Sequence, residues 1–160
     1  MRILGLDPGF GRLGYAVIET AGRRTQCLTC GCLETETTRS AGARLLTLRD
    51  SVRALLEESR PEQAVLERLY FSKNVRTALA VAEARGMLLT LLAETNVPVL
   101  EVSPQEVKSG VTGTGNAPKA QVQRMVTVLF RLDKPPRPDD AADALAIAYA
   151  GTARVLRATH

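Results

Sequence analysis

The chain has 160 residues, of which 45% are apolar and 24% are charged, and its formal net charge at pH 7 is +4. This length and apolar content fit one compact domain, residues 1–160, and we expect no second domain. No apolar segment reaches the roughly 20 residues that span a bilayer and no secretory leader opens the chain, so we expect a cytoplasmic protein without a membrane partner.

Three strands are predicted at the start of the chain. Residues 2–6 and about 13–19 have strand character and are separated by a turn that contains Gly9 and Gly11. A third strand is expected at residues 24–33, after a short turn. Because the connections between consecutive strands are short, we expect all three to pair antiparallel.

Three cysteines lie in the third predicted strand, at Cys27, Cys30 and Cys32. In a regular strand Cys30 and Cys32 face one side and Cys27 faces the other. No second cysteine pair and no nearby histidine completes a set of four zinc ligands. We therefore interpret the three residues as small buried thiols in a reducing compartment rather than as a metal site.

The rest of the chain alternates between helical and strand patterns. The segment 77–94 is apolar nearly all round, which favours either a buried core helix or a helix that also faces a second subunit. The segment 112–118 is rich in glycine and is expected to be a flexible loop without a nucleotide-binding fingerprint. The predicted helices are 42–58, 77–94, 119–131 and 140–156, and the predicted strands are 63–67 and 97–102.

Four carboxylates stand at positions where such elements end or begin: Asp7, Glu67, Asp140 and Asp143. Asp7 and Glu67 end apolar strands, and carboxyl ends of adjacent strands line the crevice where α/β proteins bind ligands. Asp140 and Asp143 are three residues apart, so they project from one face of a helix. Together the four side chains predict one acidic site.

Each carboxylate also has a purely structural interpretation. Asp7 begins an Asp-Pro-Gly turn sequence, and Asp140 with Asp143 resembles a helix cap with a dipole-compensating acid. Glu67 is harder to explain in this way, because it follows a buried apolar strand where an unpaired carboxylate is costly. Oxygen-only ligation without histidine suits Mg²⁺, and a pair of such ions is suited to phosphodiester hydrolysis. The combination indicates a nuclease.

Basic residues flank the proposed site, which favours a phosphate-binding surface, although a solvated protein surface also scatters cations at this density. The residues concerned are Arg68, Lys73, Arg76, Lys108, Lys119 and Arg124.

The predicted order of elements is βββαβαβαα, which resembles the ribonuclease H-like fold: a mixed α/β sheet of five strands, three antiparallel and then two parallel, flanked by helices. Within it, the chain resembles the RuvC Holliday junction resolvases over nearly its whole length. The residues that carry the resemblance are the segments 4–9 (Leu-Gly-Leu-Asp-Pro-Gly), Glu67 with Lys73 and Asn74, 84–86 (Ala-Arg-Gly), Val107 and Lys108 with Gly113 and Gly115, 119–122 (Lys-Ala-Gln-Val) and 140–146 (Asp-Ala-Ala-Asp-Ala-Leu-Ala).

The resemblance implies an Mg²⁺-dependent endodeoxyribonuclease that resolves four-way DNA junctions by symmetric paired nicks, in homologous recombination and DNA repair. It implies two Mg²⁺ ions per active site, which Mn²⁺ can replace, a water that attacks phosphorus in line, and a 5′-phosphate product. It also implies a homodimer, for which helix 77–94 is our interface candidate, and a junction branch-migration complex as partner. The catalytic carboxylates it implies are Asp7, Glu67, Asp140 and Asp143, with Asp139 outside the motif as a cap or an accessory charge.

The resemblance further implies DNA contacts. Lys108 and Lys119 match lysines near the catalytic centre, where they either stabilise developing phosphoryl charge or bind flanking phosphates. Tyr70 aligns with an aromatic residue that stacks on bases, but Phe71 follows directly and leaves open which ring stacks. The remaining expected DNA contacts are Lys73, Asn74 and Arg76.

Two other functions fit parts of this pattern. A different ribonuclease H-like nuclease, such as an rRNA-processing enzyme, would share the early and late aspartates but not the blocks from Glu67 to Asn74 and from Lys108 to Val122. A junction-binding protein that does not cut would gain from losing the carboxylates, since each repels phosphate.

Overall fold

A computed structural model of the chain describes residues 1–22, 24–68 and 75–158. Its elements follow the chain in the order β1 (Arg2–Asp7), β2 (Arg12–Ala21), β3 (Arg24–Glu34), α1 (Ala41–Ser59), β4 (Gln63–Glu67), α2 (Val75–Glu94), β5 (Val99–Val102), α3 (Pro104–Thr112), α4 (Lys119–Leu129) and α5 (Asp139–Ala158). Within these residues, no helix is long and apolar enough to cross a membrane.

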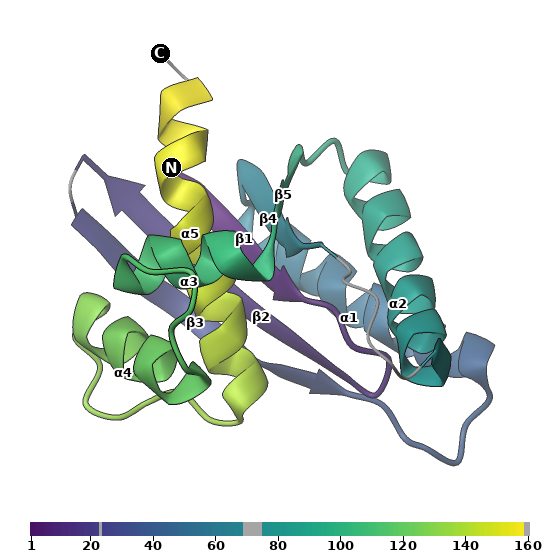
Figure 1. Ribbon diagram of the computed structural model, residues 1–160. Coiled ribbons are helices and arrows are strands. Elements are labelled where there is room, and N and C mark those ends of the chain that lie inside the picture. The colour runs from purple at the N-terminus through teal and green to yellow at the C-terminus, as the bar shows by residue number, and fades with distance from the viewer. Residues whose placement is uncertain (23, 69–74, 159–160) are drawn as a thin grey trace.

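The five strands form one mixed sheet in the order β3-β2-β1-β4-β5. The β1, β2 and β3 strands pair antiparallel, and β4 and β5 join parallel to β1 and to each other. The predicted sheet of three antiparallel and two parallel strands is confirmed. Helices α3, α4 and α5 cover one face of this sheet, and α1 and α2 cover the other (Figure 1).

Alternation along the strands assigns each side chain to one of these two layers. In β1, Ile3 packs in the cluster formed with α3, α4 and α5, whereas Leu4 and Leu6 pack against α1 and α2. In β4, Val65 belongs to the first cluster, and Ala64 and Leu66 belong to the second. The same alternation carries the final residue of each strand, Asp7 and Glu67, to the face that α5 covers.

Small residues let α5 approach the sheet closely. A Cβ atom at Gly5 would lie 2.7 Å from the amide nitrogen of Ala148, and one at Gly14 would lie 2.8 Å from the carbonyl carbon of Asp140. On the helix side, Ala144 and Ala148 are fully buried. This contact of glycine with alanine sets the first turns of α5 directly over the ends of β1 and β2.

The segment between β5 and the glycine-rich loop contains a helix, α3, that the sequence pattern did not predict. Ser103 caps it by accepting from the amide of Glu106, whose carboxylate in turn accepts from the Ser103 amide at 2.6 Å. Pro104 occupies the first turn of this capping box. The motif Ser-Pro-x-Glu is visible in the sequence and is the signal that identifies the helix. The predicted loop at 112–118 is correspondingly shorter, since Thr112 ends α3.

The prediction that Cys27 faces the opposite side from Cys30 was wrong. The pairing of β2 with β3 shifts between Val17 and Ile18, so that Ile18 pairs with Cys27. Such a bulge adds one residue to a strand and reverses the alternation beyond it. Cys27 and Cys30 therefore pack against the same core cluster, and their thiols form a side-chain hydrogen bond that raises the pKa of Cys27.

Candidate active site

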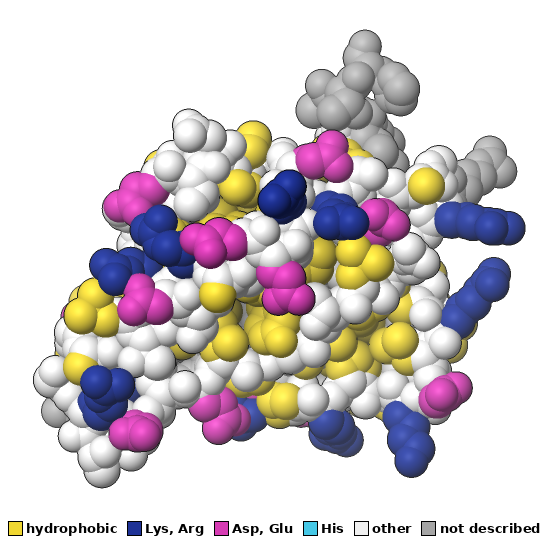
Figure 2. Space-filling model, turned by 180° about the vertical axis from the view of Figure 1, so that it is seen from behind, with side chains coloured by type: hydrophobic (Ala, Val, Ile, Leu, Met, Phe, Trp, Pro, Cys, Tyr) yellow, Lys and Arg dark blue, Asp and Glu magenta, His cyan; other side chains and the backbone are white. Residues whose placement is uncertain are grey.

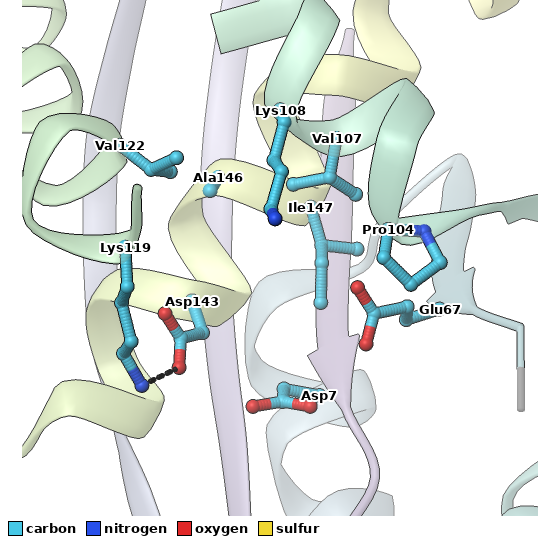
Figure 3. A pocket seen from close by; sticks show the side chains of 10 residues that line it. All are labelled: Asp7, Glu67, Pro104, Val107, Lys108, Lys119, Val122, Asp143, Ala146 and Ile147. Carbon is cyan, nitrogen blue, oxygen red and sulfur yellow. Dashed lines mark hydrogen bonds and ion pairs between the residues drawn. The ribbon is translucent and has the colours of Figure 1, made fainter. Parts of the chain in front are cut away.

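The carboxyl ends of β1 and β4 lie side by side. Leu6 pairs with Leu66 in the parallel register, so Asp7 and Glu67 are the next residues on the two neighbouring strands. Asp143 comes from α5, one helical turn beyond the residue that contacts Gly14. The carboxylates of all three residues face one pocket (Figure 3). Strand alternation and the close approach of α5 thus bring together residues that are far apart in sequence.

The pocket has a volume of about 200 Å³ and is bounded by α3, α4 and α5 in addition to the strands. The newly identified α3 contributes Pro104, Val107 and Lys108, and α4 contributes Lys119 and Val122. Both lysine side chains extend toward the acidic groups in Figure 3. The site therefore combines half-buried acids, two lysine cations and an apolar wall.

Burial and mutual repulsion oppose ionisation of these acids. The pKa of Asp7 is raised from 3.8 to about 7, first by burial and then by the charges of Glu67, Asp143 and Asp140. Burial likewise raises the pKa of Glu67, with a further contribution from Asp143. Since the charges of neighbouring carboxylates raise the pKa of Asp7 and of Glu67, a cation that neutralises these acids is favoured here.

Lys119 supplies part of that neutralisation. Its Nζ donates to Asp143 Oδ2 at 2.7 Å, and this bond raises the pKa of Lys119. The pKa of Asp143 is nevertheless raised, because its burial outweighs the effect of the lysine. Lys108 lowers the pKa of Glu67 through its charge. The two lysines thus act on different carboxylates.

Asp140 is placed differently from the other three. It does not line the pocket, and its Oδ2 lies 3.4 Å from the guanidinium of Arg12, which also pairs with Glu34 at 3.2 Å. Asp140 is still near enough for its charge to raise the pKa of Asp7. Asp139 begins α5 and pairs with Arg137, in agreement with an accessory position.

The donor set suits a hard divalent cation, since every anionic ligand is a carboxylate oxygen. In the part of the chain that the structure describes, no three acidic, cysteine or histidine side chains are close enough as they stand to hold one ion together. Asp143 instead faces Lys119, and Asp140 faces Arg12. If all four carboxylates are to bind metal, Asp143 must release Lys119 and Asp140 must release Arg12.

The expected DNA contacts fall largely outside the described residues. Tyr70, Phe71, Lys73 and Asn74 lie in the segment 69–74, which the structure does not describe, and the side chain of Arg76 is outside it too. Lys108 and Lys119 are placed at the pocket. Two candidates were not among the predicted site residues: Arg12 beside Asp140, and Arg85, which stood only in the segment 84–86 of the resemblance and donates to the Glu67 carbonyl oxygen at 2.8 Å. Neither pairing has a local sequence signal.

Comparison with known proteins gives a consistent family. The family model described as crossover junction endodeoxyribonuclease RuvC matches residues 3–151. RuvC of Petrotoga mobilis is 45% identical over 149 residues, which cover 93% of this chain and 91% of that protein. RuvC of Thermotoga petrophila is 46% identical over 162 residues, which cover 100% and 98%.

A solved structure agrees with these relatives. RuvC of T. thermophilus, in complex with a Holliday junction substrate, superposes with a TM-score of 0.93 at 31% identity, covering 99% of this chain and 97% of that one. The likeness includes the whole sheet and both helical layers, since the aligned part leaves out almost none of either chain.

Proposed function

The chain belongs to the RuvC family of crossover junction endodeoxyribonucleases, and from that premise we propose that it resolves four-way DNA junctions by metal-dependent hydrolysis of phosphodiester bonds. The observation that carries this proposal is the convergence of Asp7, Glu67 and Asp143 on one pocket that two lysines flank. A DNA-binding protein that does not cut would gain nothing from clustered acids that repel phosphate. The rRNA-processing alternative does not fit, because the relatives are junction endonucleases.

The residues that would hold a divalent cation are Asp7, Glu67 and Asp143, with Asp140 joining them from the first turn of α5. When bound there, Mg²⁺ or Mn²⁺ supplies the Lewis acidity that phosphodiester hydrolysis needs. We propose two ions per site, because four carboxylates exceed what a single Mg²⁺ commonly takes from protein.

The side chains of this protein then have separate tasks. The carboxylates would hold the divalent cations at the ends of β1 and β4. Lys119 and Lys108 extend into the pocket, where an ammonium group stabilises negative charge that grows on the phosphoryl oxygens during attack. The apolar wall of Pro104, Val107 and Val122 excludes bulk water and strengthens these interactions. We propose Tyr70, Phe71, Lys73, Asn74 and Arg76 as further DNA contacts.

We propose a homodimer in which α2 faces its counterpart, because two symmetric strands need two symmetric active sites. Figure 2 shows the face opposite to that of Figure 1, where hydrophobic side chains are exposed among the charged ones. Along α2 the exposed residues recur every three or four positions, and Leu79 alone keeps 62% of its surface accessible. That stripe consists of Leu79, Ala82, Gly86, Thr90 and Ala93.

We also propose three broader properties of the protein. Both helical layers pack on one sheet, which supports a single domain over residues 1–160. A cytoplasmic location and work alongside a branch-migration complex are proposed from the family alone.

The proposed function is tested by cleavage of a labelled synthetic four-way junction in Mg²⁺ or Mn²⁺. Linear duplex and an RNA–DNA hybrid serve as control substrates, and Asp7→Asn serves as the control protein. Cutting of the junction alone, lost in Asp7→Asn while junction binding survives, supports the proposal. Preferential cutting of the hybrid, or binding without cleavage in either metal, refutes it.

A further inference from the structure

Arg85 of α2 forms a polar link to the strand that carries Glu67. Its side chain is only 13% exposed, which is low for a cation. One guanidinium nitrogen donates to the Glu67 carbonyl oxygen at 2.8 Å, and another donates to the carboxylate of Glu101. Glu67 ends β4 and Glu101 lies in β5, so a single side chain bonds to two neighbouring strands.

The link reaches Glu67 from the side opposite to its carboxylate. In β5, Leu100 and Val102 pack in the cluster beneath α5, so Glu101 points to the other face of the sheet, where α2 lies. Arg85 therefore grips the backbone of Glu67 from the α2 side, while the Glu67 carboxylate lines the pocket on the α5 side.

The position of this grip matters because the strand ladder ends there. The last pair of β4 with β5 is Glu67 with Val102, and the next amide, that of Arg68, donates to the Val102 carbonyl oxygen at 2.8 Å. Glu67 is the last residue of β4. A side chain at the end of a strand keeps its place only if the backbone there is held, and the bond from Arg85 holds it.

The charge of the Arg85 guanidinium strengthens these hydrogen bonds. A hydrogen bond between ionised partners is roughly twice as strong as a neutral one, and the guanidinium fork fixes direction as well as distance. Glu101 is 36% exposed and has a second cation, Arg68, at 3.7 Å. Glu101 thus stays paired when Arg85 is replaced, and the principal loss is at the Glu67 carbonyl.

We propose that Arg85 is a positioning residue of the active centre: with Glu101 as its anchor, it fixes the end of β4 and so the place of the Glu67 carboxylate. This inference rests on the proposed function, since it assigns Glu67 to the metal-binding set. Loss of a residue that orients a ligand commonly lowers metal affinity by about 10- to 100-fold.

The test measures Mn²⁺ affinity of the whole protein without DNA, from the EPR signal of the free ion. Arg85→Met is expected to weaken binding by about tenfold, and Glu101→Gln to weaken it in the same direction by less. Arg85→Lys keeps one donor and should recover part of the affinity. The matched control is Arg53→Met, which removes a pair with Glu94 at 2.8 Å that ties α1 to α2 away from the pocket. That control should leave affinity unchanged.

A double variant shows whether Arg85 acts through Glu67. Glu67→Gln keeps a neutral oxygen ligand, so weakened Mn²⁺ binding remains measurable at high metal concentration. If Arg85 serves to place Glu67, adding Arg85→Met to Glu67→Gln causes little further loss, whereas independent effects multiply. Multiplying effects would overturn the proposal, as would a folded Arg85→Met protein with unchanged affinity.

The same variants distinguish two further outcomes: misfolding of Arg85→Met, and failure of the assignment of Glu67. If Arg85→Met does not fold, as judged by circular dichroism, Glu101→Gln and Arg85→Lys carry the decision, and wild-type affinity in both overturns the proposal. If Glu67→Gln itself leaves both Mn²⁺ affinity and junction cleavage unchanged, the assignment of Glu67 in the proposed function has failed, and the inference about Arg85 falls with it.

Discussion

Gly5 of β1 lies against the backbone of Ala144 in α5, so that a Cβ atom at residue 5 would clash with the Ala144 carbonyl oxygen. This contact sits two residues before Asp7 and next to Asp143, and it determines how near α5 comes to the sheet. The separation of two acids that are 136 positions apart in the chain is thus set by the smallest side chain available.

Gly5→Ala is expected to lower the free energy of unfolding by about 1–3 kcal/mol, because the added methyl group has no space without moving α5. Urea unfolding measures the change. Gly42→Ala is the control, since a Cβ atom there meets nothing within 4 Å. It should leave stability unchanged or raise it by about 0.5–1 kcal/mol. Equal stability of the two variants would contradict the close packing of α5.

Asp7→Asn is expected to stabilise the metal-free protein above about pH 7. Because the pKa of Asp7 is raised from 3.8 to about 7, the native state holds a proton between these values that the unfolded chain has lost. The contribution of Asp7 to the free energy of unfolding therefore falls as pH rises through this window, by up to about 4 kcal/mol at 1.4 kcal/mol per pKa unit. Asparagine does not titrate, so the variant does not lose this stability as pH rises.

Urea unfolding in a chelator at about pH 5 and pH 8 tests this prediction. The stability gained by Asp7→Asn should be larger at the higher pH. Asp50→Asn is the control, because Asp50 is exposed on α1 beside Arg49. A gain that is equal at both pH values would mean that the pKa of Asp7 is ordinary.

Lys119→Met is expected to lower the single-turnover cleavage rate by about 100-fold while junction affinity changes little, because a donor to developing charge is lost. Lys134→Met removes an exposed lysine that does not line the pocket and should leave the rate unchanged. Quenched-flow cleavage and gel-shift binding separate the two effects. If Lys119→Met instead weakens junction binding but leaves the cleavage rate at saturation unchanged, Lys119 is a phosphate contact.

Leu79→Glu is expected to convert a dimer into monomers, since it places a charge in the exposed stripe of α2. Sedimentation velocity reports the change. The two nicks on one junction should then no longer be made together. Leu46→Glu changes a residue of α1 with 51% exposure and should leave the assembly intact. Dissociation by both variants, or by neither, would rule out α2 as the interface.

Much of the fold follows from local pattern. Alternation in β1 and β4 places Asp7 and Glu67 on one face, and both strands pair as their connections predict. The spacing of Asp140 and Asp143 likewise places them on one helix. These are short-range properties, and they can be predicted from the periodicity and the turn residues of the sequence.

The remainder depends on contacts between distant segments. The pairing of Arg12 with Asp140 and of Arg85 with Glu101 joins elements whose approach no local pattern encodes. The bulge in β3 at Leu28, next to Cys27, likewise depends on how β3 pairs with β2. Only α3 was missed despite a readable signal, the capping box from Ser103 to Glu106.

The most direct measurement maps the nicks on all four strands of one synthetic junction and then treats the products with DNA ligase. If the carboxylates around Asp7 form a metal-dependent hydrolytic centre present twice in a symmetric dimer, two strands of like polarity are cut at equivalent positions and both nicks are resealed. Nicks at unrelated positions, or ends that ligase cannot join, would contradict the account.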